Sequence, residues 1–230
     1  MFVYWPDYYY IILVVLALIL SVIAQIGVKG TYKRYSGILN SRGLTGAAAA
    51  QKVLAFYGIY NVRIEQVSGK LTDHYDPRAN VIRLSSGVYS GSSIAAVGVA
   101  CHEAGHAAQH AQNYVPIKIR NAILPVANIG SSAGIYLAII GYFLGFSILV
   151  NIGIVLFAFV VLFQLVTLPI EFNASSRAIK VIDETGLLDV EEQIGAKKML
   201  AAAAMTYVAS LLVSIMSLLR LILRFNSRRD

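Results

Sequence analysis

Residues 121–170 read NAILPVANIGSSAGIYLAIIGYFLGFSILVNIGIVLFAFVVLFQLVTLPI, and none of these 50 residues is Asp, Glu, Lys or Arg. A membrane-spanning helix needs about 20 apolar residues, so the stretch is long enough for two spans joined by a tight turn. Gly145 and nearby polar residues interrupt the apolar run, and we expect the turn to lie within residues 141–151. The stretch therefore predicts a transmembrane hairpin with spans at about residues 122–143 and 149–170.

Two further apolar stretches, at about residues 9–28 and 199–219, bring the expected number of spans to four. Over the whole chain, 57% of the residues are hydrophobic and 13% are charged, and the mean hydropathy is +0.67. Soluble domains carry about 45–50% apolar and about 25% charged residues. This composition excludes an ordinary soluble enzyme and a disordered chain, and the single cysteine excludes a disulfide scaffold. It predicts an integral membrane protein in contact with the lipid bilayer.

Two polar segments, residues 29–121 and 171–198, separate the spans. The first segment holds eleven Lys and Arg residues against four acidic residues. Because an excess of Lys and Arg marks cytoplasmic segments, we expect a multi-pass plasma-membrane protein with both polar segments on the cytoplasmic face. The formal net charge of +7 then reports topology, and we expect no nucleic-acid partner.

The basic C-terminus does not fit this topology. Four arginines, Arg220, Arg224, Arg228 and Arg229, follow the last span on the side that four crossings make external. Two explanations remain open: the last helix does not cross fully, or the positive-inside rule is violated there.

Short elements are expected in the first polar segment. Thr45 is a candidate N-cap for a helix that ends near residue 57, and a second helix is expected at about residues 94–113. Apolar residues between 62 and 67 and the alternating residues 81–85 predict strands, whereas 71–77 has the composition of a loop. The predicted fold class is mainly α, integral membrane, with about four transmembrane helices and a small cytoplasmic α+β unit. We also expect the 81–85 strand to lie at a sheet edge, where an extended peptide could add to it.

The motif His102-Glu103-Ala-Gly-His106 carries the predicted chemistry. On a helix, His102 and His106 are one turn apart on one face, so both imidazoles can bind one zinc ion. Glu103 can then serve as the general base for a zinc-activated water. The alternative is a buried hydrogen-bonded cluster of these three side chains or a solvated helix face, but such a cluster is costly to bury without a partner.

A catalytic zinc site needs three protein ligands and one open position. Glu171 is the first charged residue after the neutral stretch, and we expect it to be the third ligand, although an acid there could equally be a solvated helix-end residue. His110 is the rival, but it lies about 12 Å along the helix from His102, too far for one ion. The three-histidine pattern also needs a His ten positions after the first ligand, where this chain has Gln112.

The remaining polar candidates lie near these ligands in the sequence. His110, Asn173 and Arg177 are candidates for contacts to the ligands or to substrate. His74, within an Asp-rich stretch, could line the cleft and donate to the oxyanion, or it could be a simple turn residue. Cys101 points away from His102 on a helix and is most simply an apolar filler.

Four motifs, LTDHYDPR, IRLS, ACHEAGHAAQHAQ and PIEFNASSRA, together resemble the bacterial membrane-bound neutral zinc metallopeptidase family (YugP-like), of the gluzincin type HExxH…E. The resemblance covers almost the whole chain. It implies one zinc ion held by His102, His106 and Glu171, with Glu103 as general base. A more distant similarity links the chain to the HtpX and CAAX-processing membrane proteases, which carry an Asp four positions after the ligand Glu. Because Ser175 stands there, we expect the support of the zinc-binding histidine to differ.

These observations predict one metallopeptidase domain over residues 1–230, in which residues 29–121 and 171–198 form a zincin-like catalytic unit on the cytoplasmic face. We expect a membrane-embedded zinc metalloendopeptidase that hydrolyses peptides or membrane proteins. Two alternatives differ from it. One is a site-2-type intramembrane protease, which would need a later Leu-Asp-Gly ligand sequence that this chain lacks. The other is a non-enzymatic membrane protein with a structural zinc site, which would need a fourth protein ligand.

Overall fold

The computed structural model describes the backbone of residues 7–226 and the side chains of residues 11–223. Of the C-terminal arginines, Arg228 and Arg229 lie outside the described residues. The chain divides into two compact units. One, the membrane unit, comprises residues 1–25, 118–168 and 206–230. The other, the polar unit, comprises residues 26–117 and 169–205.

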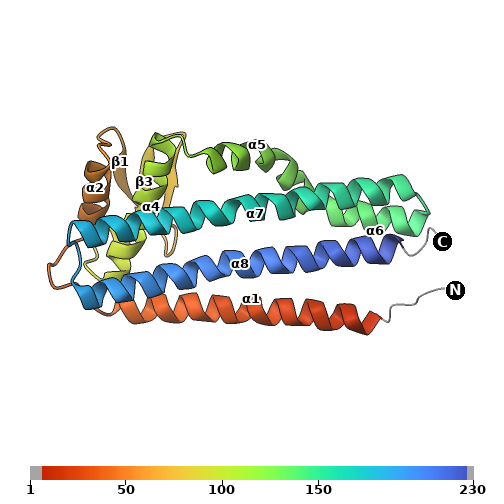
Figure 1. Ribbon diagram of the computed structural model, residues 1–230, viewed down its shortest axis with the longest axis horizontal. Coiled ribbons are helices and arrows are strands. Elements are labelled where there is room, and N and C mark those ends of the chain that lie inside the picture. Colours follow the sequence, from red (N-terminus) through yellow and green to blue (C-terminus); the bar gives the residue numbers. More distant parts are fainter. Residues whose placement is uncertain (1–6, 227–230) are drawn as a thin grey trace. The chain divides into compact units, whose positions relative to one another are not determined.

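Long helices dominate the chain, as predicted (Figure 1). Four helical segments are long and apolar enough to cross a membrane: Ile11–Ser36, Val115–Leu144, Ser147–Glu184 and Val190–Leu223. They belong to α1 (Asp7–Ser36), α5 (Val115–Ile129), η1 (Gly130–Gly134), α6 (Ile135–Leu144), α7 (Ser147–Glu184) and α8 (Val190–Asn226). The helices are longer than the predicted spans because α1, α7 and α8 continue through polar residues and contribute to both units.

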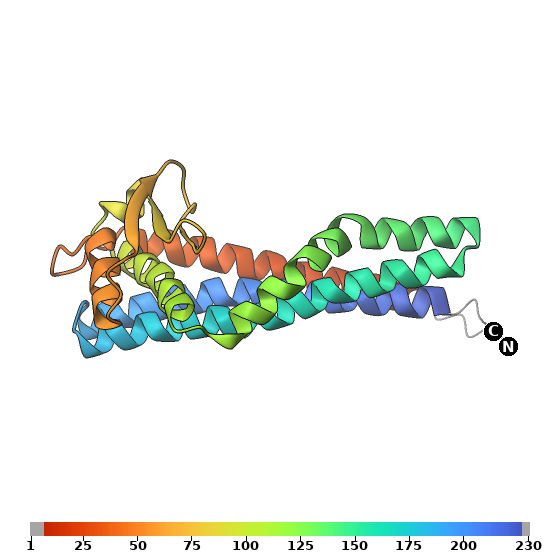
Figure 2. The same cartoon turned by 90° about the horizontal axis from the view of Figure 1, so that it is seen from above.

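The hairpin of the membrane unit turns where the charge-free stretch holds its polar residues. Helix α6 ends at Leu144, and Gly145 caps it with a φ of +75°, a left-handed conformation that favours glycine. Helix α7 begins two residues later and returns beside α6, as both views show (Figures 1 and 2). Helix α5 contains Pro125 and joins α6 through η1, a five-residue π-helix. Proline and a π-turn both interrupt regular helix hydrogen bonding and bend the chain.

Three helices and a three-stranded sheet lie wholly within the polar unit. Its elements are α2 (Gly46–Phe56), β1 (Arg63–Val67), β2 (His74–Asp76), β3 (Val81–Ser85), α3 (Ser86–Tyr89) and α4 (Ile94–Ala111). Thr45 and Ser93 cap α2 and α4, because each hydroxyl accepts a hydrogen bond from a backbone N–H three residues later. Buried alanines on α2 and α4 let the two helices pack closely, and β3 buries Ile82 and Leu84 in the same core.

The structure corrects two expectations about the strands. The 81–85 strand, β3, is the central strand and not an edge, because it pairs parallel to β1 and antiparallel to β2. Residues 71–77 are not all loop, because His74–Asp76 form β2. Asp73 ends the loop by accepting hydrogen bonds from the backbone and hydroxyl of Ser85, and this contact aligns β2 with β3. The exposed edge beside the site therefore belongs to β2.

Candidate metal centre

The two histidines of the HEAGH motif lie on one face of α4, one turn apart. Their Nε2 atoms are 3.1 Å apart, and their rings meet edge to face with centroids separated by 4.7 Å. Both side chains are largely buried. Helical spacing alone brings the two imidazoles this close, because residues i and i+4 are neighbours on a helix surface.

Glu171 of α7 completes a group of three donor atoms. Its Oε2 lies 3.4 Å from the Nε2 of His102 and 3.6 Å from the Nε2 of His106. Ligand atoms at about 2.0–2.1 Å from a tetrahedrally coordinated zinc ion are about 3.3 Å from one another. The observed separations match this value, so two nitrogens and one carboxylate oxygen could hold one zinc ion.

A close approach of α4 to α7 brings Glu171 to the histidines. Gly105, between the two histidines, faces the backbone of Ala174, and a Cβ on Gly105 would lie 2.5 Å from the Ala174 carbonyl oxygen. Glycine is therefore required at this contact for packing, since any side chain would push the helices apart. Ala178, one turn after Ala174, is fully buried in the core that contains α4.

The outer nitrogen of each histidine has a hydrogen-bond partner. The Nδ1 of His102 lies 3.1 Å from the hydroxyl of Ser175, and the Nδ1 of His106 lies 3.0 Å from the Oε1 of Gln109. Such contacts fix the ring orientation and the tautomer, with Nε2 left for a metal. Ser175 is the position where the distantly similar proteases carry Asp. The supporting chemical group differs, as we expected, but the position is the same.

Gln109 is a site residue that sequence reasoning missed. It is fully buried, and its amide group donates to the Ile170 carbonyl at 2.8 Å and to the Asn173 Oδ1 at 3.0 Å. Gln109 thereby joins α4 to the segment of α7 that carries Glu171. Its position three residues after His106 places it on the same helix face, which is the signal that could have identified it.

Asn173 and Arg177 extend this network outward. The Asn173 Oδ1 also accepts from the Arg177 Nε at 2.7 Å, and the Arg177 Nη1 donates to the Gln112 Oε1 at 2.6 Å. The Arg177 guanidinium lies over the Tyr57 ring, 5.5 Å from its centroid. Asn173 therefore contacts Gln109, which supports His106, and Arg177 contacts Asn173; neither residue belongs to the donor group itself.

Glu103 is buried on α4 beside the donor group. Its Oε2 accepts a hydrogen bond from the backbone N–H of Tyr75 in β2, at 3.0 Å. Strand β2 thus passes over the carboxylate and holds one of its oxygens. The Tyr75 hydroxyl lies within hydrogen-bond distance of Asn80 and of the His110 Nδ1, at 2.9 and 3.2 Å.

The structure places His110 and His74 away from the donor group. His110 is exposed and contacts Tyr75, and within the described residues the donor group consists of His102, His106 and Glu171 alone. His74 is exposed, and its Nδ1 lies 2.7 Å from the Thr72 carbonyl.

Charges on the site alter the pKa of His106. Burial by itself lowers this pKa, but the hydrogen bond to Glu171 and the negative charges of Glu103 and Glu171 outweigh it and raise the pKa above 6.5. A positive charge, whether a proton or a metal ion, is therefore favoured between these carboxylates.

Asp76 is the last residue of β2. Hydrogen bonds from Arg83 and from two backbone amides lower its pKa to about 2.

Cys101 is fully buried next to His102 in the sequence, but it packs into the hydrophobic core and is not part of the donor group. Burial raises the pKa of its thiol far above the ordinary range. The thiol is therefore an apolar group in this fold.

Comparison with known proteins agrees with this geometry. The chain is 47% identical over 221 residues to "Putative membrane protease YugP" of Bacillus subtilis (strain 168), an alignment that covers 96% of this chain and 98% of that protein. No solved structure matches the chain. The four apolar helices and this relative identify a membrane protein. Residues 10–226 match the model of one family, and the chain therefore belongs to the family described as "Putative neutral zinc metallopeptidase".

Proposed function

We propose that this protein is a membrane-embedded zinc endopeptidase that acts as one domain on peptides or membrane proteins. The observation that carries the proposal is the group of two Nε2 atoms and one carboxylate oxygen, separated by 3.1–3.6 Å, with the buried Glu103 beside it. His102, His106 and Glu171 would hold the zinc ion. When bound, zinc would activate a water molecule and polarise the peptide carbonyl.

Glu103 is the general base in this proposal. Its carboxylate would take a proton from the attacking water and then pass that proton to the leaving amine. The Tyr75 N–H orients one carboxylate oxygen, Oε2, so that the other oxygen remains for proton transfer. Ser175 and Gln109 would keep each Nδ1 protonated and each Nε2 directed at the metal.

Strand β2 is the proposed binding edge for the substrate backbone. Within a strand, the N–H and C=O of one residue point to the same side, and successive residues alternate. The Tyr75 N–H reaches Glu103 and therefore points away from β3, so the Tyr75 carbonyl lies on the same free edge. An extended peptide could donate a hydrogen bond to this carbonyl while its scissile bond lies near Glu103.

The donor group favours a catalytic zinc site over a structural zinc site and over a site-2-type protease. A structural zinc site has four protein ligands. Among the described residues, no fourth His, Cys, Asp or Glu joins the group, which leaves one coordination position for water. The third donor is a Glu at the polar end of α7, which does not follow the Leu-Asp-Gly pattern of site-2-type proteases.

The proposed location of the site is the cytoplasmic face. Lys29, Lys33 and Arg34 follow the first apolar segment, and Lys118 and Arg120 lie near the start of the second. Single cysteines in a Cys101→Ala background test this sidedness. A membrane-impermeant maleimide added to intact cells should label Phe146→Cys in the hairpin turn and should not label Lys70→Cys in the polar unit. The reverse labelling pattern would place the site outside.

The activity is tested with purified full-length protein and fluorescein-labelled casein. Glu103→Gln should keep one zinc ion per chain and lose about 10²–10⁴-fold in cleavage rate, the usual contribution of a general base. Glu171→Ala should lose the zinc, measured by elemental analysis. Glu184→Gln is the matched control, because Glu184 is exposed on the same helix and pairs only with Lys180 at 3.8 Å. Cleavage by Glu103→Gln at the wild-type rate would refute the mechanism.

A further inference from the structure

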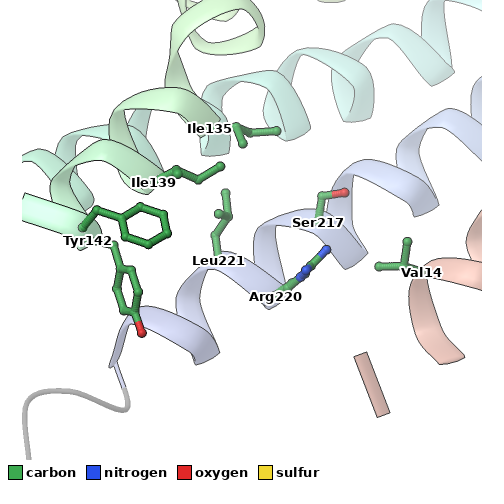
Figure 3. Close-up of a pocket in the computed structure, with 8 residues that line it drawn as sticks. Val14, Ile135, Ile139, Tyr142, Ser217, Arg220 and Leu221 are labelled. Atoms are coloured by element: carbon green, nitrogen blue, oxygen red, sulfur yellow. The ribbon is translucent and has the colours of Figure 1, made fainter. Parts of the chain in front are cut away.

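The membrane unit contains an apolar crevice with one charged residue in its wall. The crevice has a volume of about 350 Å³ and is lined by Val14 of α1, by residues of α6 and by residues of α8: Ile135, Ile139, Tyr142, Phe143, Ser217, Arg220 and Leu221. Figure 3 shows Leu221 directed toward Ile135 and Ile139, with Arg220 next to it on α8 and Ser217 one turn earlier. The volume falls within the range of small-molecule sites, about 300–1,000 Å³.

Among the described residues that line the crevice, Arg220 alone is charged. Among the side chains of residues 11–223, no carboxylate lies within salt-bridge distance of its guanidinium. The hydroxyl of Ser217 donates to the Val213 carbonyl and supplies no charge. A guanidinium at the edge of a bilayer is costly unless an anion accompanies it.

The position of Arg220 along α8 indicates which anion is available. It lies six residues before the end of the helix at Asn226, which is about 9 Å along the axis. Tyr142 is likewise close to the hairpin turn at Gly145. The crevice is therefore near the end of the apolar helices, where the phosphates of a bilayer crossed by these helices would lie.

We infer that the crevice binds an anionic phospholipid such as phosphatidylglycerol. The phosphate accepts hydrogen bonds from the Arg220 guanidinium, and one acyl chain lies against Ile135, Ile139 and Leu221. The positive charge of Arg220 favours this lipid over a zwitterionic one, and the apolar walls of the crevice favour it over a free anion. The binding also gives a role to one of the C-terminal arginines that the topology left unexplained.

The test measures lipid binding to the full chain by native mass spectrometry in detergent micelles that contain dioleoyl-phosphatidylglycerol or dioleoyl-phosphatidylcholine. Wild type should retain phosphatidylglycerol more tightly than phosphatidylcholine. Arg220→Gln should weaken phosphatidylglycerol binding about fivefold, the usual effect of one basic residue at an anionic surface, and should leave phosphatidylcholine binding unchanged. Arg34→Gln, which removes the same charge from an exposed position on α1, should bind both lipids as wild type does.

Two further measurements separate the lipid from other occupants. Ile139→Trp fills the crevice and should weaken both lipids, because it removes the space for an acyl chain. Inorganic phosphate should not compete with phosphatidylglycerol. Four results would each overturn the inference. They are equal binding of the two lipids by wild type, unchanged phosphatidylglycerol binding in Arg220→Gln, displacement of the lipid by inorganic phosphate, and a lipid-free dimer closed over the crevice.

Discussion

Gln109 allows the sharpest test of how the fold prepares the metal site, and the informative change is Gln109→Met. Methionine has nearly the same length and suits the fully buried position, but it cannot hydrogen bond. Asn173 keeps its bond from Arg177, and the Ile170 carbonyl remains within the hydrogen bonding of α7. The His106 Nδ1, by contrast, loses the one hydrogen-bond partner that it has among the described residues.

The expected loss of zinc affinity follows from the unpaired Nδ1 of His106. An unsatisfied buried donor costs about 1–3 kcal/mol. Without metal, His106 can relieve this cost by rotating or by changing tautomer, but metal binding requires a free Nε2 and hence a protonated Nδ1. The cost therefore falls mainly on the metal-bound state. Zinc affinity should decrease about 5- to 150-fold, at about 1.4 kcal/mol for each tenfold change.

Competition with a chromophoric zinc chelator measures this affinity in detergent-purified protein, and circular dichroism monitors folding. Gln112→Met is the matched control, because Gln112 is exposed and accepts a bond only from Arg177; its zinc affinity should stay within about twofold of wild type. Gln109→Glu should restore zinc affinity, because it keeps an oxygen acceptor for His106, while thermal stability falls through the lost amide donors. Folded Gln109→Met that binds zinc as tightly as wild type would refute the reasoning.

Three other outcomes are expected. Gly105→Ala should lower the free energy of unfolding by about 1–3 kcal/mol and also weaken zinc binding, because the new Cβ meets the Ala174 carbonyl. A thermal or denaturant assay measures the first effect, and unchanged values would contradict the close helix contact. Zinc affinity should fall about tenfold per pH unit once the pH is below the raised pKa of His106, because zinc must displace the proton that Glu171 stabilises on this histidine. A chelator titration between pH 5 and pH 8 that shows no pH dependence would exclude this competition. Cys101 should react with iodoacetamide only after denaturation, and rapid labelling of the native protein would show that the core around it opens.

Local sequence features were sufficient to predict the main elements. The charge-free stretch predicts two apolar helices because a membrane span depends only on length and composition, and Gly145 allows the turn between them. Thr45 and Ser93 indicate where α2 and α4 begin, since an N-cap acts within three residues. His102 and His106 lie together for the same reason, because helix geometry alone sets the distance between residues four apart.

Strand order could not be predicted in this way. Residues 81–85 alternate as a strand should, but periodicity contains no information about which neighbours pair with it. Strand β3 is central because β1 and β2 both pair with it, and β2 forms where Asp73 contacts Ser85 and Asp76 contacts Arg83. These contacts join residues up to twelve positions apart, outside the range of any turn signal.

The remaining part of the site depends on tertiary packing. The pattern of charges suggested Glu171 as a donor, but only the contact of Gly105 with Ala174 brings its carboxylate within 3.4–3.6 Å of the two histidines. Gln109 has no charge and no metal-binding chemistry, so its position on the same helix face as His106 was the one sequence signal for it. Its role arises because its amide faces α7 across the helix contact, and this contact joins residues more than 60 positions apart. Helix spacing thus determined two of the three donors, and the packing of α4 on α7 supplied the third donor and the hydrogen bonds that orient them.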